Sequence, residues 1–164
     1  MNRRLVVEAD GGSRGNPGPA AYGAVVREEA TGEALVELAG HLGVTTNNVA
    51  EYTGLLEGLR AAMEVDPDAH VEARLDSKLV VEQMSGRWAI KNDALRRLAL
   101  QAREVVPRER VSFTWVPRER NKAADALANE SMDAVERGRD GTIRRSATDA
   151  YETETEQDPV PPGP

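Results

Sequence analysis

The order of β-rich and helix-patterned segments constrains the fold of this chain more than any other feature of its sequence. Three β-rich segments come first, with only short connections between them: residues 4–10, 20–27 and 33–42. Thr31 and Gly32, between the second and third segments, are typical of a hairpin turn. Strands joined in this way are expected to pair as antiparallel neighbours.

Helix-patterned segments then alternate with two further β-rich segments. The helices are expected over residues 48–65, 77–84, 92–105 and 121–135. The additional strands are expected over residues 69–75 and 110–116. This alternation predicts an α/β fold with one five-stranded mixed sheet, in which three antiparallel strands are followed by parallel strands and the sheet is flanked by helices.

The last part of the chain differs in composition from the rest. Large apolar residues almost vanish beyond residue 137, and acidic residues and prolines become frequent. Residues 138–164 are therefore predicted to form a disordered acidic tail that ends in prolines. The folded domain is expected to be residues 1–137, and removal of residues 141–164 is expected to leave its fold intact.

Composition excludes several classes of protein. The chain of 164 residues contains no cysteine, which excludes a disulfide scaffold, a thiolate zinc site and catalysis by a cysteine nucleophile. No stretch approaches the roughly 20 apolar residues that a membrane helix requires, and the first residues lack the pattern of a signal peptide. A cytoplasmic protein without a membrane partner is expected.

The distribution of charge is uneven along the chain. The net charge is −7, from 21 basic and 28 acidic residues, yet residues 87–122 contain ten basic residues against four acidic ones. This basic segment has two interpretations. It is either a surface that contacts the backbone of a nucleic acid or a solvated face of helices with salt bridges.

Four acidic residues stand at positions from which their side chains could meet. Asp10 and Asp76 each end a predicted strand, and parallel strands that end together place such residues at one crevice. Glu51 lies in the first turn of a helix, and Asp125 lies among alanines early in the last helix. Taken singly, Asp10 would be a turn residue and Asp76 a helix cap. Glu51 would be half of a capping box with Asn48, and Asp125 would be an acid on a helix surface. Together they predict a cation site, because four carboxylates repel one another unless Mg²⁺ or Mn²⁺ lies between them.

Five motifs carry a resemblance to a known family. They are residues 10–19 (DGGSRGNPGP), 45–52 (TTNNVAEY), 76–77 (DS), 115–116 (WV) and 121–128 (NKAADALA). In their order and spacing, across nearly all of residues 1–137, the chain resembles ribonuclease H of type 1. The resemblance implies a ribonuclease H-like fold and an endonuclease that hydrolyses the RNA strand of RNA–DNA hybrids, leaving 5′-phosphate and 3′-hydroxyl ends.

The resemblance also implies roles for individual residues. The metal ligands would be Asp10, Glu51, Asp76 and Asp125. They would hold two Mg²⁺ ions, for which Mn²⁺ can substitute. The substrate-binding residues would be Gly11, Gly12, Gly15, Asn16, Thr46, Asn47, Asn48 and Ser77. Among these, Asn48 would reach the 2′-hydroxyl groups that distinguish RNA from DNA. The partner would be an RNA–DNA hybrid duplex, and the protein is expected to act as a monomer.

The loop before the last helix departs from the family pattern. Many relatives carry a histidine there, whereas this chain has Pro117, Arg118, Glu119 and Arg120. Arg118 is the substitute by position and is therefore included among the candidate catalytic residues. Its guanidinium can stabilise charge on a phosphate but carries protons poorly, because its pKa exceeds about 12.

Two other functions are open at this point. A non-catalytic module that binds hybrids would keep Asn16, Thr46, Asn47 and Asn48 but would not need four acids. A transposase-like or junction-cutting nuclease would keep the acids but cut another substrate, and Asn47 with Asn48 disfavours it because these side chains suit a 2′-hydroxyl. A nucleotide-binding loop is disfavoured, because the glycines lack the spacing of such loops. Trp115 is expected to lie in the core.

Overall fold

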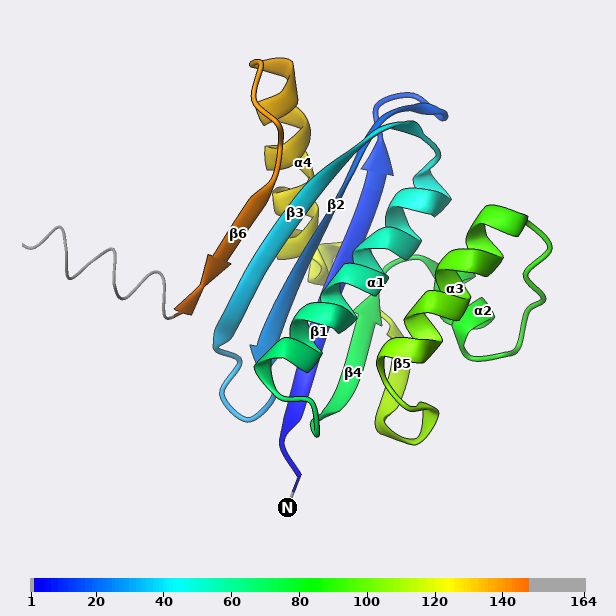
Figure 1. Ribbon diagram of the computed structural model, residues 1–164, viewed down its shortest axis with the longest axis vertical. Helices are drawn as coiled ribbons and strands as arrows, with labels where there is room; N and C mark the ends of the chain where they lie inside the picture. The colour runs from blue at the N-terminus through cyan, green and yellow to red at the C-terminus, as the bar shows by residue number, and fades with distance from the viewer. Residues whose placement is uncertain (1, 148–164) are drawn as a thin grey trace, which may run out of the picture.

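The computed structural model describes residues 2–147 and contains a six-stranded mixed sheet with helices on both faces (Figure 1). The strands are β1 (Arg4–Ser13), β2 (Gly18–Glu28), β3 (Ala34–Thr45), β4 (His70–Leu75), β5 (Val111–Trp115) and β6 (Ile143–Ser146). The helices are α1 (Asn47–Val65), α2 (Lys78–Met84), α3 (Asp93–Val105) and α4 (Lys122–Glu136). Across the sheet the order is β5-β4-β1-β2-β3-β6.

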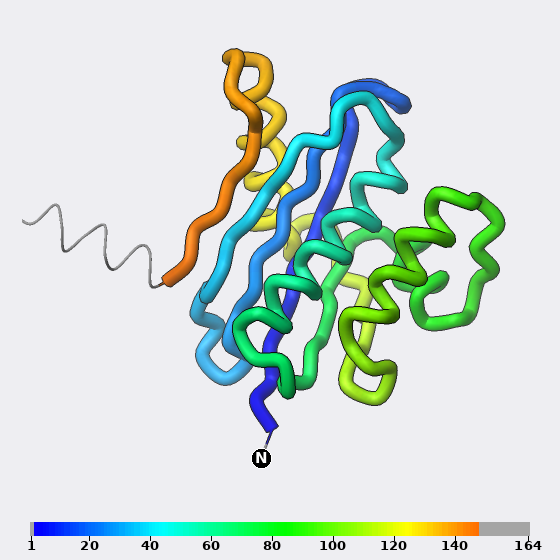
Figure 2. Tube along the Cα trace, in the orientation of Figure 1, coloured from blue at the N-terminus to red at the C-terminus, as the bar shows by residue number. Residues whose placement is uncertain are grey.

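The pairing of the strands confirms the predicted α/β architecture. The first three strands form an antiparallel meander, with β1 beside β2 and β2 beside β3. The strand β4 pairs in parallel with β1, and β5 pairs in parallel with β4. The strands β1 and β4, far apart in the sequence, thus lie side by side within the sheet (Figure 2).

The sixth strand corrects the predicted count of five. Residues 143–146 pair antiparallel with β3, so part of the segment expected to be a tail belongs to the sheet. Ile143 is the one large apolar residue of β6, which explains why hydropathy did not reveal the strand. Besides its backbone pairing with β3, the strand makes two exposed ion pairs: Arg144 contacts Glu64 at 2.5 Å, and Arg145 contacts Glu130 at 2.6 Å. The rest of the predicted tail, residues 148–164, lies outside the described residues.

Two apolar layers hold the helices to the sheet. The larger one lies between α1, α3 and the sheet, and includes the fully buried Leu5, Val7 and Leu55. On the opposite face, α4 packs on β2 and β3 through a smaller cluster that includes Val25 and Leu127. These layers position α1 and α4 on opposite sides of the central strands (Figure 1).

Two local boundaries differ from the sequence interpretation. The strand β1 continues through Gly11 and Gly12 to Ser13, so the glycines do not end it. The helix α1 is capped by Thr46, whose Oγ1 accepts a hydrogen bond from the Val49 N–H, and not by an Asn48–Glu51 capping box. Serine supplies the cap of α2 in the same way, because Ser77 Oγ accepts from the Val80 N–H. Within the described chain, no helix combines the length and apolar character needed to cross a membrane.

Candidate active site

Three carboxylates meet although they come from three different elements. Asp10 lies in β1, Glu51 lies in the first turns of α1, and Asp76 directly follows β4. The parallel register pairs Ala9 with Leu75, so Asp10 and Asp76 stand side by side on neighbouring strands. Each of the three acids offers one carboxylate oxygen within 4.8 Å of the others. They line a small depression beside Ser77.

The close approach of these acids has a clear electrostatic effect. Burial raises the pKa of Asp10 to about 8, and the neighbouring charge of Asp76 adds to the rise against a backbone hydrogen bond from Gly11. Burial also raises the pKa of Glu51 to about 7, although a hydrogen bond with Ser77 and the positive charge of Arg118 oppose it. Without a cation, these two carboxyl groups therefore resist ionisation near neutral pH.

The donor atoms fit a hard divalent cation. The cluster consists only of carboxylate oxygens, which are the ligands that Mg²⁺ and Mn²⁺ prefer. Asp76 Oδ2 is buried and has no hydrogen-bond partner within the described part of the chain. A buried acceptor without a partner is costly, and a bound cation would satisfy it. Among residues 2–147, this is the one group of three or more such side chains.

The other two predicted catalytic residues lie near the cluster and do not join it. Asp125, in the first turn of α4, is exposed, and its oxygens are not in the 4.8 Å group. Its charge nevertheless contributes to the raised pKa of Asp10. Arg118 is exposed on a short 3₁₀ turn, Arg118–Arg120, and its charge reaches Glu51.

Trp115 lies next to the site and not in the core, which corrects the sequence expectation. Its side chain is 50% exposed at the end of β5. The indole Nε1–H donates a hydrogen bond of 3.1 Å to the carbonyl oxygen of Asp76. Trp115 is the last residue of the edge strand β5, beyond Val111 and Phe113, which pack against the core.

The predicted substrate-binding asparagines join the β1–β2 hairpin to the start of α1. Asn47 Oδ1 accepts hydrogen bonds from the backbone N–H and the hydroxyl of Ser13, at 2.8 and 2.9 Å. The Asn47 N–H in turn donates to Asn16 Oδ1 at 3.2 Å. Asn48 remains exposed beside them. The structure therefore brings Asn16, Asn47 and Asn48 together on one surface.

A groove that the sequence did not reveal lies beside this surface. It has a volume of about 380 Å³ and lies between the first residues of α1 and those of α3. Its lining includes Asn16, Thr46, Asn48 and Asn92. Asn92 caps α3 through a hydrogen bond from the Leu95 N–H, and this capping pattern is the signal that could have found it. Two helix N-termini meet here, which favours an anionic group.

The three glycines have different roles. Gly11 is buried beneath α1, where it has a packing role, and its place against the RNA strand stays a prediction. Gly12 has open space, because a Cβ there would meet only Asn47 Oδ1, at 3.9 Å. Gly15 is exposed at the hairpin tip with a φ of +96°, a conformation that favours glycine.

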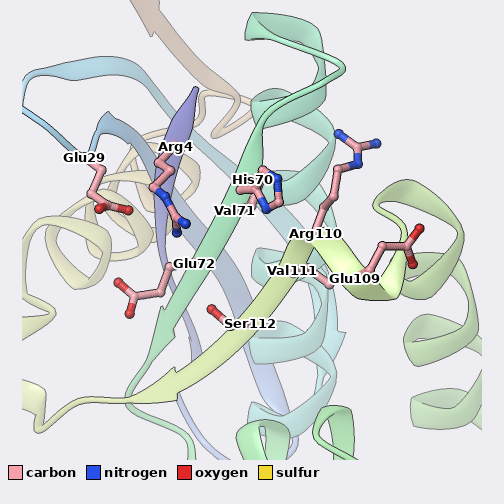
Figure 3. Close-up of a pocket in the computed structure, with 9 residues that line it drawn as sticks. All are labelled: Arg4, Glu29, His70, Val71, Glu72, Glu109, Arg110, Val111 and Ser112. Carbon is pink, nitrogen blue, oxygen red and sulfur yellow. The ribbon is translucent and has the colours of Figure 1, made fainter. Parts of the chain in front are cut away.

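A second hollow, of about 210 Å³, lies at the opposite end of the parallel strands (Figure 3). Its polar lining includes Arg4, His70, Arg110, Glu29, Glu72 and Glu109. Arg110 is engaged with the chain itself, since it donates to the carbonyl oxygens of Pro67 and Ala69. The mixture of charges and the distance from Asp10 and Asp76 separate this hollow from the carboxylate site.

The fold and the cluster define an α/β domain with a candidate cation site near the carboxyl ends of its parallel strands. A family model described as "Reverse transcriptase-like" matches residues 8–131. The ribonuclease H of Erythrobacter litoralis is 31% identical over 150 residues, which are 80% of this chain and 97% of that protein. LC11-RNase H1, solved in complex with an RNA/DNA hybrid, has a TM-score of 0.74 and 38% identity, covering 80% of this chain and 98% of that one.

A mycobacterial relative is longer than this chain. The bifunctional protein of Mycobacterium tuberculosis is 50% identical over 133 residues, which are 80% of this chain. The chain spans only 36% of that relative's length. The solved N-terminal RNase H domain of the same protein, fused to maltose binding protein, has a TM-score of 0.78 and 49% identity, covering 84% of this chain and 99% of that one. The chain belongs to the type 1 ribonuclease H family.

Proposed function

We propose that this chain is an endonuclease that hydrolyses the RNA strand of RNA–DNA hybrids with two Mg²⁺ ions, leaving 5′-phosphate and 3′-hydroxyl ends. The observation that carries the proposal is the cluster of Asp10, Glu51 and Asp76 in a chain of the ribonuclease H family. The structural similarity to LC11-RNase H1, whose solved complex contains an RNA/DNA hybrid, supports the choice of substrate.

In this proposal the acidic side chains hold the cations. Asp10, Glu51 and Asp76 supply the close oxygens, and the unpartnered Oδ2 of Asp76 is free to bind. Asp125 completes the set from α4, where its charge already acts on Asp10. The bound Mg²⁺ or Mn²⁺ would supply an activated water and neutralise charge on the phosphate. Ser77 orients Glu51 through its hydroxyl.

The surface at the start of α1 would bind the hybrid. Asn48 is exposed there, with a side chain able to donate to and accept from a 2′-hydroxyl. Asn16, Thr46 and Asn92 border the groove between α1 and α3, where the two helix N-termini favour a phosphate. Contacts of this kind recognise the shape of the duplex and the sugar, so we expect little preference for base sequence.

Cleavage of an end-labelled RNA–DNA hybrid in Mg²⁺ or Mn²⁺ tests the proposal. The natural chain should cut the RNA strand, EDTA should stop the reaction, and Asp76→Asn should reduce the rate by at least 100-fold. Glu72→Gln is the matched control, because Glu72 is a carboxylate of β4 outside the cluster, paired with Arg74 at 2.7 Å. It should retain the natural rate.

Other substrates and products complete the test. Duplex DNA and branched DNA, assayed in parallel, should remain uncut, and their cleavage would indicate a different nuclease. Hybrid binding that persists in EDTA, without cleavage in either cation, would instead indicate a non-catalytic binding module. The ends of the products should accept a 3′ extension and resist 5′ phosphorylation unless first dephosphorylated.

A further inference from the structure

We infer that Asn121 is a positioning residue that anchors Arg118 and Asp125 to the strand that carries Asp10. The inference concerns how the proposed active site is held together, and it therefore rests on the proposed function. Asn121 immediately precedes α4 and is 1% exposed, one of only three buried polar or charged residues among residues 2–147.

The side chain of Asn121 contacts the central strand next to the cluster. Its Nδ2 donates a hydrogen bond of 2.9 Å to the carbonyl oxygen of Ala9. Ala9 directly precedes Asp10, so the contact joins two segments that are 112 residues apart in the sequence. This buried hydrogen bond fixes the start of α4 relative to the strand that positions Asp10.

The backbone of Asn121 contacts both of the other candidate catalytic residues. Its N–H donates to the carbonyl oxygen of Arg118 at 3.0 Å, which closes the turn that presents the guanidinium. Its carbonyl oxygen accepts from the Asp125 N–H at 3.2 Å, in the first turn of α4. One residue therefore links, through hydrogen bonds, Arg118, Asp125 and the neighbour of Asp10.

The geometry separates this role from ordinary helix capping. Asparagine at an N-cap usually accepts a hydrogen bond from the first turn of its helix. Here α4 has no side-chain cap bond, and Asn121 Oδ1 is buried without a partner in the described chain. The side-chain amide of Asn121 thus binds Ala9 and does not cap α4. A residue that served only to start the helix would not be arranged in this way.

The surroundings of Asn121 show which segment depends on its side chain. Close contact between Gly23 and Ala124 holds the start of α4 against β2, because a Cβ on Gly23 would lie 2.3 Å from the Ala124 carbonyl oxygen. The preceding turn has no comparable support, since all three of its residues are exposed. Without the Asn121 side chain, this turn should lose its fixed position relative to Asp10, and the hydrogen bond from the Asp125 N–H to Asn121 should weaken with it.

Kinetics of Asn121→Ala and of Asn121→Leu, which keeps the branching of the side chain but cannot donate a hydrogen bond, test the inference on the full chain. Both variants should lower kcat for hybrid cleavage at least 10-fold with KM changed by less than threefold. Ser131→Ala is the matched control, because Ser131 is also buried on α4 and also donates one hydrogen bond to a carbonyl oxygen, that of Gly141. It should lower the melting temperature by a similar amount and leave kcat within twofold of the natural value.

A double-mutant cycle shows whether the effect passes through Asp125. If Asn121 acts by placing this carboxylate, adding Asn121→Ala to Asp125→Asn should slow cleavage less than threefold further. If the double variant instead shows the product of the two single fold-losses in rate, Asn121 does not act through Asp125. A kcat within twofold of the natural value in both Asn121 variants would overturn the positioning role as a whole.

Hydrogen exchange separates a failure of this inference from a failure of the proposed function. Without substrate or metal, Asn121→Ala should accelerate exchange of the Asp125 and Asn121 amides at least 10-fold, whereas Ser131→Ala should act only near residues 131–141. Unchanged exchange at Asp125 and Asn121 would contradict the anchoring, whatever the activity. An inactive natural chain with accelerated exchange in the variant would instead refute the nuclease and preserve the anchor.

Discussion

Gly11 and Ala50 are in direct backbone contact: a Cβ on Gly11 would lie only 2.2 Å from the carbonyl carbon of Ala50. Gly11 follows Asp10 and Ala50 precedes Glu51, so this contact sets how closely the two carboxylates approach each other. Helix α1 can lie this near to β1 only where the strand carries no side chain.

Replacing Gly11 with alanine should therefore disturb both the fold and the site. We expect Gly11→Ala to lower the free energy of unfolding by about 3 kcal/mol, because the overlap involves backbone that cannot move aside. The affinity for Mn²⁺ should fall as Asp10 and Glu51 separate. Urea unfolding and calorimetric titration measure the two effects.

Gly12→Ala is the control for stability, because its nearest new contact would be the side-chain oxygen of Asn47 at 3.9 Å. We expect it to change the free energy of unfolding by less than about 1 kcal/mol. Equal stability of the two variants would contradict the role of the Gly11–Ala50 contact.

The raised pKa values of Asp10 and Glu51 imply a pH dependence of the cation-free protein. Both carboxyl groups bind a proton more readily in the folded chain than in the unfolded chain, where the reference pKa is about 4. The resulting stabilisation is fully present below that value and is lost as the pH rises through about 7 for Glu51 and about 8 for Asp10. Allowing for solvent screening of half-buried groups, we expect a loss of about 2 kcal/mol between about pH 5 and 9.

Urea unfolding in EDTA, with Asp10→Asn as the comparison, isolates the contribution of Asp10. The variant should lose less stability over the same pH interval, because its amide does not titrate. Saturating Mg²⁺ should remove most of the loss in the natural chain, since a bound cation favours the ionised carboxylates. Superimposable pH profiles of the two proteins would show that Asp10 is not the titrating group.

Arg118→Ala should slow turnover more than it weakens binding. The guanidinium lies close enough to Glu51 to lower the pKa of that carboxyl group, which places its charge beside the proposed reacting phosphate. We expect kcat for hybrid cleavage to fall about 10-fold, or about 1.4 kcal/mol of activation free energy, with little change in KM. Arg120→Ala, in the same exposed turn, should have less effect. An unchanged kcat in Arg118→Ala would remove this residue from the mechanism.

Because β6 belongs to the sheet, the effect of truncation on the melting temperature should depend on whether β6 is removed. A chain that ends at residue 147 should keep the natural melting temperature, because β6 and its ion pairs remain. A chain that ends at residue 140 should melt about 5 °C lower, since it loses four paired residues and the bond from Ser131 to Gly141. Equal melting temperatures of the two truncated chains would show that β6 adds no stability. They would then support the expectation from the sequence that the fold stays intact without residues 141–164.

Local patterns in the sequence were sufficient to predict most of the sheet. The meander, the parallel additions and all four helices follow from periodicity and turn residues, because those signals depend on neighbours along the chain. The strand β6 did not follow, since it carries one large apolar residue and its charged residues Arg144 and Arg145 contact acids on distant helices. Trp115 was placed wrongly because it alternates with Val111 and Phe113, which do pack against the core, and only the structure shows that its own ring stays exposed at the end of β5.

The sequence by itself determined the family, the order of the elements and the acids that form the cluster. These features depend on residue type and spacing, which a motif carries directly. Only the tertiary structure decided that Asp10, Glu51 and Asp76 meet while Asp125 lies outside the 4.8 Å group, and that Asn121 binds Ala9 and does not cap α4. The physical reason is that such contacts join residues dozens of positions apart. Their distances depend on strand register and on how closely helices pack against the sheet, and spacing along the chain does not specify either one.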